Sequence, residues 1–279
     1  MDWNKFIQQA LDEDVREGDH TSLSCINEDA IGKAQLYVKD EGILGGIELA
    51  QLIFRYLDPS IHFHKILNDG DEIHPGQIAF ELEGNARAIL IGERLALNCM
   101  QRMSGIATLT HEYVKRVKGF KAKILDTRKT TPLFRAAEKW AVRIGGGQNH
   151  RFGLFDMILI KDNHIDYCGG IVNAIVAAKK YLEENNLSLQ VEVETRTLHD
   201  IELVLKTAGV NRIMLDNFSL ENLQSAIKMI GGRFQTEASG GVNLETVRDI
   251  ADTGVDFISV GAITHSYKSL DLSLKAKIT

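Results

Sequence analysis

A cluster of cationic side chains between Thr127 and His164 is the part of this sequence that is best suited to chemistry. Seven Arg or Lys residues stand there against three acidic ones, although the whole chain has a formal net charge of −6. The cations are Arg128, Lys129, Arg135, Lys139, Arg143, Arg151 and Lys161, and His150 lies among them. A single-sign cluster that opposes the overall charge predicts a cleft for an anion, with a basic surface patch as the alternative.

Two carboxylates and two loops of small residues follow the cationic cluster. Glu194 and Asp216 come at the ends of successive hydrophobic runs, and paired carboxylates suit Mg²⁺, which takes few direct protein ligands. The loops 238–241 and 260–262 are of the kind that binds phosphate through backbone N–H groups. A ligand that matches these groups carries carboxylates, a Mg²⁺-bound pyrophosphate and a sugar phosphate. The expected phosphate-binding residues are Ser239, Gly240, Gly241, Val260, Gly261 and Ala262.

Short apolar runs alternate with amphipathic helical segments from residue 123 onward. The predicted strands are 123–126, 141–145, 157–160, 189–193, 212–216, 234–238 and 256–260. Alternating strands and helices predict a parallel sheet with right-handed crossovers, and seven strands favour an α/β barrel over an open sheet. No GxGxxG motif follows a strand, which disfavours a dinucleotide-binding domain. Because nearly every candidate residue directly follows a strand, we expect these residues to meet at the C-terminal mouth of the barrel.

The first third of the chain has an α+β pattern. Helical spacing covers 2–14 and 46–57, and a long amphipathic segment runs over 86–118 with an interruption near Ser104-Gly105. The predicted strands of this part are 34–39, 61–66 and 78–84.

Composition bounds the class of protein. Three widely spaced cysteines predict buried free thiols rather than disulfides or a zinc cluster. A pI near 5.9 argues against general nucleic-acid binding. No apolar run approaches the ~18 residues of a membrane helix, and the acidic N-terminus has no apolar signal core. We therefore expect a cytoplasmic protein with no membrane partner.

Six motifs of this sequence, in their order and spacing, resemble those of the quinolinate phosphoribosyltransferase family, also called nicotinate-nucleotide diphosphorylase (carboxylating). They are TRKTTP, GGGQNHRFGLFDMILIKDNH, VEVET, LDNF, ASGGV and VGAITH. The resemblance covers essentially the whole chain, including EDVREGDHTS and GERLALN. It implies a seven-stranded, incomplete TIM-like α/β barrel over 109–265. An N-terminal α+β open-sandwich domain over 1–108 would be joined by the segment 266–279, in a homodimer or a multiple of dimers.

The resemblance also implies the reaction and the roles of single residues. Quinolinate and phosphoribosyl pyrophosphate, with Mg²⁺, would give nicotinate mononucleotide, pyrophosphate and CO₂ in de novo NAD biosynthesis. Glu194 and Asp216 match the metal and ribose carboxylates of the family, and Arg94 matches an arginine that enters the neighbouring subunit's site. Lys129 and Lys161 are further catalytic candidates, as acids that protonate the product. The family's quinolinate- and pyrophosphate-binding positions are Thr127, Arg128, Lys129, His150, Arg151 and Lys161.

Three alternative functions stay open at this point. A molybdenum-transport-associated relative shares TRKT and the GGG-x-NHR pattern, although the continuation FDMILIKDNH favours the quinolinate enzyme. A Schiff-base lyase would use Lys129 or Lys161 at a barrel strand end. A non-catalytic anion-binding protein would need the cations but not Glu194 and Asp216.

Overall fold

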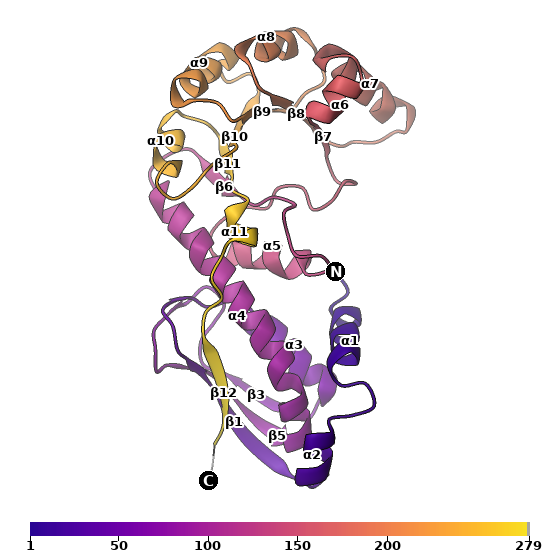
Figure 1. Cartoon of the computed structure of the whole chain (residues 1–279), viewed down its shortest axis with the longest axis vertical. Coiled ribbons are helices and arrows are strands. Elements are labelled where there is room, and N and C mark those ends of the chain that lie inside the picture. Colours follow the sequence, from indigo (N-terminus) through magenta and orange to yellow (C-terminus); the bar gives the residue numbers. More distant parts are fainter. Residues whose placement is uncertain (278–279) are drawn as a thin grey trace. The chain divides into compact units, whose positions relative to one another are not determined.

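The computed structural model describes residues 1–277, which divide into two compact units (Figure 1). Unit 1 comprises Met1–His111, Thr131–Gly146 and the C-terminal segment from Ser266, and unit 2 comprises Glu112–Thr130 and Gly147–His265. The first boundary falls inside helix α4, and the C-terminal segment joins unit 1. The division differs from the sequence-based domain limits chiefly at residues 131–146, which we had expected in the barrel domain.

Unit 1 is built on a four-stranded antiparallel sheet with the strand order β12-β1-β5-β3. The strands of the unit are β1 (Ile31–Val38), β2 (Gly42–Ile43), β3 (His62–Lys65), β4 (Glu72–Ile73), β5 (Ile78–Asn85) and β12 (Leu272–Ala276). Its helices are α1 (Trp3–Asp14), α2 (His20–Cys25), α3 (Ile47–Leu57), α5 (Arg135–Ile144) and the first part of α4 (Ala86–Arg116). The predicted helices 2–14 and 46–57 and the strands 34–39, 61–66 and 78–84 lie at their expected places.

Helix α5 replaces the strand that we expected over 141–145, so that prediction is wrong. Ala137, Ala141 and Val142 are buried at helical spacing, and the glycine run that starts at Gly145 ends the helix. A five-residue apolar run does not distinguish a strand from one face of a short helix, which explains the error. In unit 1, Trp140 packs against Trp3 with their ring centroids 5.6 Å apart.

Helix α4 is continuous from Ala86 to Arg116, without the expected interruption at Ser104-Gly105. Both small residues serve close packing instead. Ser104 Oγ accepts from the Gly45 amide at 2.9 Å, and a Cβ on Gly105 would lie 2.3 Å from the carbonyl oxygen of Lys268. Small side chains inside a helix therefore mark a close backbone approach here rather than a break.

Unit 2 contains a six-stranded parallel sheet with the order β6-β11-β10-β9-β8-β7 (Figure 1). Its strands are β6 (Lys123–Leu125), β7 (Ile158–Ile160), β8 (Val191–Thr195), β9 (Arg212–Asp216), β10 (Gln235–Ser239) and β11 (Phe257–Ser259). The outermost named strands in this order are β6 and β7, and an isolated parallel bridge joins Leu125 of β6 to Gln148. The α/β class with a separate antiparallel domain is confirmed, but the barrel sheet has six strands in the described residues, not seven.

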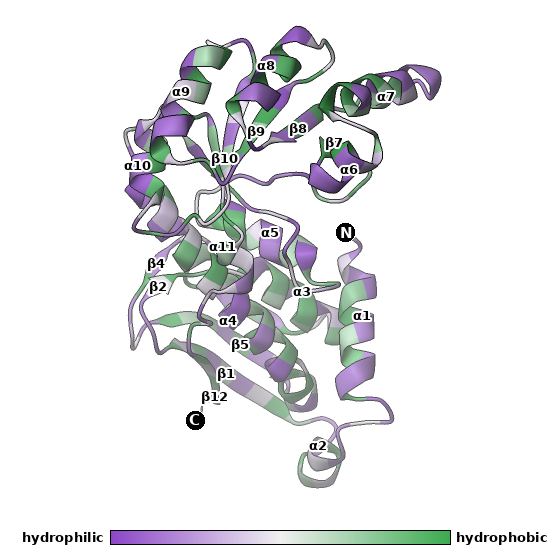
Figure 2. Cartoon of the chain, turned by 45° about the horizontal axis from the view of Figure 1, so that its top comes forward, coloured by the Kyte–Doolittle hydropathy of each residue, from purple (hydrophilic) through white to green (hydrophobic). Residues whose placement is uncertain are grey.

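Helices cover the outer side of this sheet within unit 2 (Figure 1). They are α6 (Asp162–Tyr167), α7 (Ile171–Glu184), α8 (Leu198–Lys206), α9 (Leu220–Ile230) and α10 (Val247–Asp252). The remaining helix, α11 (Ala262–His265), follows β11. Hydrophobic and hydrophilic residues both run along α8 and α9, as in helices that cover a core on one side (Figure 2). The Thr197 hydroxyl accepts from the Asp200 amide and caps α8, and Gly231 at φ +60° ends α9.

Membrane-spanning character is missing from residues 1–277: none of their helices combines the length and the apolar character that crossing a bilayer requires. The prediction of three buried thiols holds only for Cys99, since Cys25 is exposed and Cys168 is half-buried.

Candidate active site

A cavity of about 820 Å³ lies in unit 2 at the carboxyl ends of the parallel strands. Its lining comes from the ends of β8, β9 and β10 and from the segments that follow β6, β7 and β11, as the strand-end pattern predicted. The structure brings together these predicted site residues: Thr127, Arg128, Lys129, His150, Arg151, Lys161, Glu194, Asp216, Ser239, Gly240, Gly241, Gly261 and Ala262.

The cationic part of the lining consists of Arg128, Lys129, Arg151 and Lys161. The Thr127 hydroxyl accepts from the Lys129 amide at 3.0 Å, and the Thr264 hydroxyl donates to the Lys129 carbonyl at 2.9 Å. These bonds fix the turn after β6. Within the described residues, Arg128 Nε is buried without a hydrogen-bond partner, a state that is costly unless a ligand pairs with it. The guanidinium groups are thus arranged to bind an anion.

Arg151 is held at both of its ends. Its Nη1 donates to the Met157 carbonyl at 3.2 Å, and its backbone amide donates to His150 Nδ1 at 2.7 Å. Burial lowers the pKa of Arg151, and the positive charge of Arg128 lowers it further. Two neighbouring guanidinium groups that repel each other favour an anion with more than one negative charge.

The other three cations of the sequence cluster do not line the cavity. Arg135, Lys139 and Arg143 lie on α5, which belongs to unit 1. The sequence did not distinguish these three cations from those of the cavity, because neighbouring segments of a chain can carry the same charge and still belong to different units. Our expectation that the whole cluster builds one cleft is therefore wrong for this helix.

Glu194 and Asp216 lie at the ends of β8 and β9 and both line the cavity. Burial raises the pKa of Glu194, and the negative charge of Asp216 raises it further, whereas Lys161 lowers it. Lys161 Nζ is 3.9 Å from Glu194 Oε2. Two carboxylates that repel each other beside an open cavity are a donor set that fits Mg²⁺ together with phosphate oxygens of a substrate.

Small residues form the remaining wall. Gly240 has a φ of +94°, and a Cβ there would lie 2.1 Å from Asn217 Oδ1. The Asn217 amide donates to the Ser239 carbonyl at 2.8 Å, and its side chain donates to Asp216 Oδ2 at 2.6 Å. Asn217 thereby links Asp216, one of the two carboxylates suited to Mg²⁺, to the small-residue loop that follows β10.

Two sequence-predicted site residues lie outside the cavity lining. Val260 is 1% exposed, and its amide donates to the Leu125 carbonyl at 2.9 Å, so it is not available to a phosphate. Arg94 is exposed on α4 in unit 1. The prediction of Val260 as a phosphate ligand is therefore wrong for this conformation.

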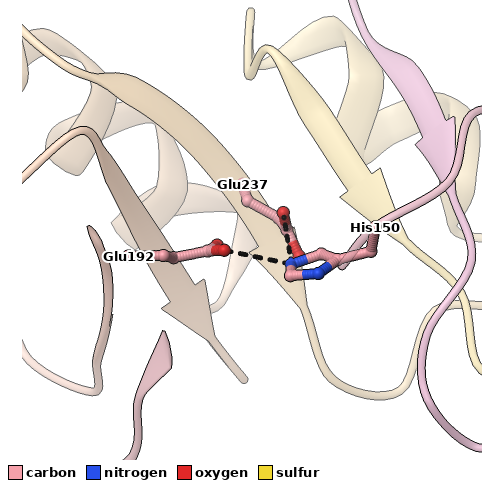
Figure 3. A group of neighbouring side chains, drawn as sticks. All are labelled: His150, Glu192 and Glu237. Carbon is pink, nitrogen blue, oxygen red and sulfur yellow. Dashed lines mark ion pairs between the residues drawn. The ribbon is translucent and has the colours of Figure 1, made fainter. Parts of the chain in front are cut away.

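Three ionisable side chains, His150, Glu192 and Glu237, form a buried cluster at the floor of the cavity (Figure 3). His150 Nε2 lies 3.0 Å from Glu192 Oε2 and 3.5 Å from Glu237 Oε2, and both glutamates have no exposed area. Arg212 Nη1 lies 2.8 Å from Glu237 Oε2. The ligand atoms of the histidine and the two glutamates lie within 4.8 Å of one another, but the guanidinium already supplies the positive charge that a metal ion would bring.

The pKa values in this cluster follow from burial and mutual charge. Burial and the charge of Glu237 raise the pKa of Glu192 to about 7. For Glu237, burial acts upward, but His150 and Arg212 outweigh it and lower the pKa. For His150, burial acts downward, and the two carboxylates act upward and raise the pKa above its usual range. The Arg151 amide acts against that rise, because its N–H points at Nδ1. We assign the neutral Nε2–H form, since a second ring proton would displace this amide.

Comparison with known proteins decides the family. The sequence profile of the quinolinate phosphoribosyl transferase N-terminal domain matches residues 19–104, and that of the C-terminal domain matches residues 106–275. The chain belongs to the quinolinate phosphoribosyltransferase family.

Similar proteins within this family come from plants and bacteria. The chloroplastic nicotinate-nucleotide pyrophosphorylase (carboxylating) of Arabidopsis thaliana is 49% identical over 98% of this chain and 82% of its own length. A probable enzyme of the same name from Bacillus subtilis is 42% identical over 99% of this chain and 93% of its length. The crystal structure of NadC from Streptococcus pyogenes superimposes with a TM-score of 0.92 at 40% identity, covering 98% of this chain and 95% of that one.

Several lining residues of this family member were missed by sequence reasoning. They are Asp162, Asn217, Glu237 and His265 in the cavity wall, with Glu192 and Arg212 behind it. A signal for the two glutamates was present, because each lies within a run that we expected to be a strand of the parallel sheet, and strands of such sheets are buried on both faces. A charge at such a position needs a partner and therefore indicates a site.

Proposed function

We propose that this chain transfers the phosphoribosyl group of phosphoribosyl pyrophosphate to quinolinate, with decarboxylation, and forms nicotinate mononucleotide, pyrophosphate and CO₂. The observation that carries the proposal is the separation of charge in one cavity. Cations line the side formed after β6 and β7, two carboxylates stand at the ends of β8 and β9, and small-residue loops follow β10 and β11. The relatives named above support the same reaction through their names.

The cations have a direct role in substrate binding. Quinolinate carries two neighbouring carboxylates, and guanidinium groups pair with carboxylates through two parallel hydrogen bonds. Arg128, with its buried unpaired Nε, and Arg151 are assigned to this diacid. Thr127 and His150 complete its side of the cavity. Leaving a dianion unpaired in this half-buried place would cost several kcal/mol per charge, which is why several cations gather there.

The carboxylates and small residues serve the sugar donor. Glu194 and Asp216 would hold Mg²⁺ with the pyrophosphate of the donor, and the ion would supply positive charge that stabilises the leaving group. Lys129 and Lys161 add ammonium groups on that side. Ser239, Gly240, Gly241, Gly261 and Ala262 let the 5′-phosphate approach the backbone. Glu194 and Asp216 also stabilise the positive charge that develops at the anomeric carbon while pyrophosphate leaves.

Decarboxylation follows from the new bond. Once the pyridine nitrogen carries the ribose, the ring is cationic, and the carbon next to that nitrogen can keep the electron pair of its bond to the carboxylate. CO₂ leaves, and this carbon then takes a proton from an acid. Lys129 and Lys161 are the ammonium groups of the cavity lining, and we assign the proton donor to this pair.

The family match favours this function over the molybdenum-transport-associated relative, the Schiff-base lyase and the non-catalytic anion-binding protein. An assay of the purified chain with Mg²⁺ and phosphoribosyl pyrophosphate tests it. We expect nicotinate mononucleotide and CO₂ in equal amounts from quinolinate, and no product from nicotinate as the rival acceptor. Turnover of nicotinate without CO₂ release would contradict the proposal. Borohydride trapping of a carbonyl substrate would instead support the lyase.

The assembly that we propose is a homodimer, or a multiple of dimers, in which Arg94 of one subunit completes the site of the other. Arg94 is exposed and is not among the residues that line the cavity of its own chain. Beside Arg151, Leu154 and Phe155 are 71% and 72% exposed, as apolar side chains at a covered face would be in an isolated subunit. A cytoplasmic location is part of the same proposal, and cell fractionation tests it.

A further inference from the structure

Protein atoms lie close to both ring nitrogens of His150. Nε2 lies 3.0 Å from Glu192 Oε2, and Nδ1 accepts the backbone N–H of Arg151 at 2.7 Å. In Figure 3 dashed lines join the two glutamates, which come from β8 and β10, to the same ring nitrogen. His150 therefore offers no ring N–H to a substrate unless one of these contacts breaks. Its position at the cavity floor needs another explanation than a direct hydrogen bond to the diacid.

A continuous chain of contacts links the interior of the sheet to the cavity through His150. The Arg212 guanidinium stacks on the Phe257 ring, 4.1 Å from its centroid, and holds Glu237 at 2.8 Å. Glu237 and Glu192 hold Nε2 of His150, and the imidazole holds the amide of Arg151. The chain ends at a side chain that lines the cavity.

The loop that carries His150 is fixed from a second side as well. Asp126, which is fully buried at the end of β6, accepts from the His150 amide at 2.8 Å and from Asn149 Nδ2 at 2.6 Å. The backbone amide of His150 and both nitrogens of its ring are thus all fixed. The Arg151 backbone therefore has little freedom. The buried acids fix the position from which its side chain extends into the cavity.

We propose that Glu192 and Glu237 are positioning residues that orient Arg151 for the diacid through the imidazole of His150. The proposal rests on the function proposed above, since it assigns quinolinate to Arg151. Neither glutamate needs to touch the substrate. Burying two carboxylates without exposed area under an anion site costs desolvation free energy. Apolar side chains of similar volume would fill the same space without that cost. Their presence is explained if the ring nitrogen requires an acceptor.

Two variants of similar size distinguish the loss of the oxygen at residue 192 from the loss of side-chain volume. Glu192→Gln keeps an oxygen beside Nε2 without the negative charge, and Glu192→Leu removes that oxygen. With Glu192→Gln, we expect the KM for quinolinate to stay within about threefold of the natural protein, and with Glu192→Leu to rise about tenfold or more. The KM for phosphoribosyl pyrophosphate should change less than about twofold in both. Glu184→Gln, an exposed change of the same chemistry, serves as the control.

A spectroscopic measurement does not depend on turnover, and its first two parts, on the natural protein and on Glu192→Gln, do not depend on folding of the leucine variant. The ¹⁵N resonances of His150, identified with a His150→Gln variant, should show a neutral ring with its proton on Nε2. In Glu192→Gln this form should persist, and in Glu192→Leu the amide resonance of Arg151 should shift.

The outcomes distinguish the two proposals. An imidazolium or an Nδ1–H form in the natural protein would overturn the positioning role, and so would equal rises of both KM values in Glu192→Leu. If the ring has the expected form but quinolinate is not converted, the proposed function fails while the chain of contacts stands.

Discussion

The side-chain oxygen of Asn217 occupies the space that any side chain at residue 240 would need, 2.1 Å from the position of a Cβ on Gly240. The two residues follow neighbouring strands, and Gly240 also has a φ of +94°. Asn217 in turn donates to Asp216. A change at Gly240 must therefore disturb the loop assigned to phosphate and a carboxylate assigned to the metal at the same time.

We expect Gly240→Ala to raise the KM for phosphoribosyl pyrophosphate about tenfold or more, since the clash displaces Asn217 or the loop. Gly254→Ala is the matched control, because Gly254 has a φ of +87° with nothing within 4 Å of the added Cβ. It carries the backbone strain alone, ~1–2 kcal/mol of stability. Steady-state kinetics and thermal unfolding of both variants test this. Similar kinetic losses in the two would show that strain, not the clash, is responsible.

Arg151→Ala should weaken quinolinate binding by about ten- to a hundredfold, because a charge-assisted pair contributes ~1.5–3 kcal/mol. Binding of phosphoribosyl pyrophosphate should change much less, since the carboxylates and small loops hold it on the other side of the cavity. Isothermal titration with each ligand separately measures both effects. Equal losses for the two ligands would remove Arg151 from the diacid side.

The sequence predicted much of unit 2 because two of its features are local: the spacing of hydrophobic residues along each strand and helix, and the polar residues at the strand ends. Buried parallel strands are short apolar runs, and a polar residue at the end of such a run lies at the mouth whatever the rest of the fold does. For this reason the sequence alone predicted that Glu194, Asp216 and Lys161 line one cavity, as they do in the structure.

The remainder depends on contacts that no local pattern encodes. The run 141–145 has the composition of a strand, and only packing in unit 1, such as Trp140 against Trp3, makes it a helix. Val260 looked like a phosphate-loop residue until its amide was found bonded to the Leu125 carbonyl. Glu192 and Glu237 were passed over because their partners, His150 and Arg212, come from other parts of the chain.

Removal of Mg²⁺ should abolish measurable binding of phosphoribosyl pyrophosphate and leave quinolinate binding within about threefold. The reason is that Glu194 and Asp216 then face the pyrophosphate with negative charge on both sides. Glu194→Gln should increase the Mg²⁺ concentration needed for half-maximal activity. Titrations with and without a chelator measure the first effect, and activity against Mg²⁺ measures the second. Tight binding of the sugar donor in the presence of the chelator would contradict the assignment.

Cys99 should resist alkylation in the folded protein while Cys25 reacts. Burial raises the pKa of the Cys99 thiol from 9.0 to about 12, so at pH 8 the reactive thiolate is about a thousandfold rarer than at an unperturbed cysteine. At pH 8 the exposed Cys25 should be labelled, and Cys99 should stay unlabelled. Mass spectrometry of peptides after iodoacetamide treatment measures this, with unfolded protein as the control. Labelling of Cys99 in the folded state at a rate near that of Cys25 would refute its burial.

Arg94→Ala and Lys161→Ala should each be inactive alone and regain activity when mixed. If Arg94 acts in the partner's site, a mixed dimer has one site with both defects and one site with neither, so random exchange restores about a quarter of all sites. Activity is measured after subunit exchange under mild denaturation and refolding. A mixture of Lys161→Ala with Glu194→Gln is the control, because both of these residues line the cavity of one chain and every mixed site keeps a defect. Recovery in the control as well, or in neither mixture, would place Arg94 outside a shared site.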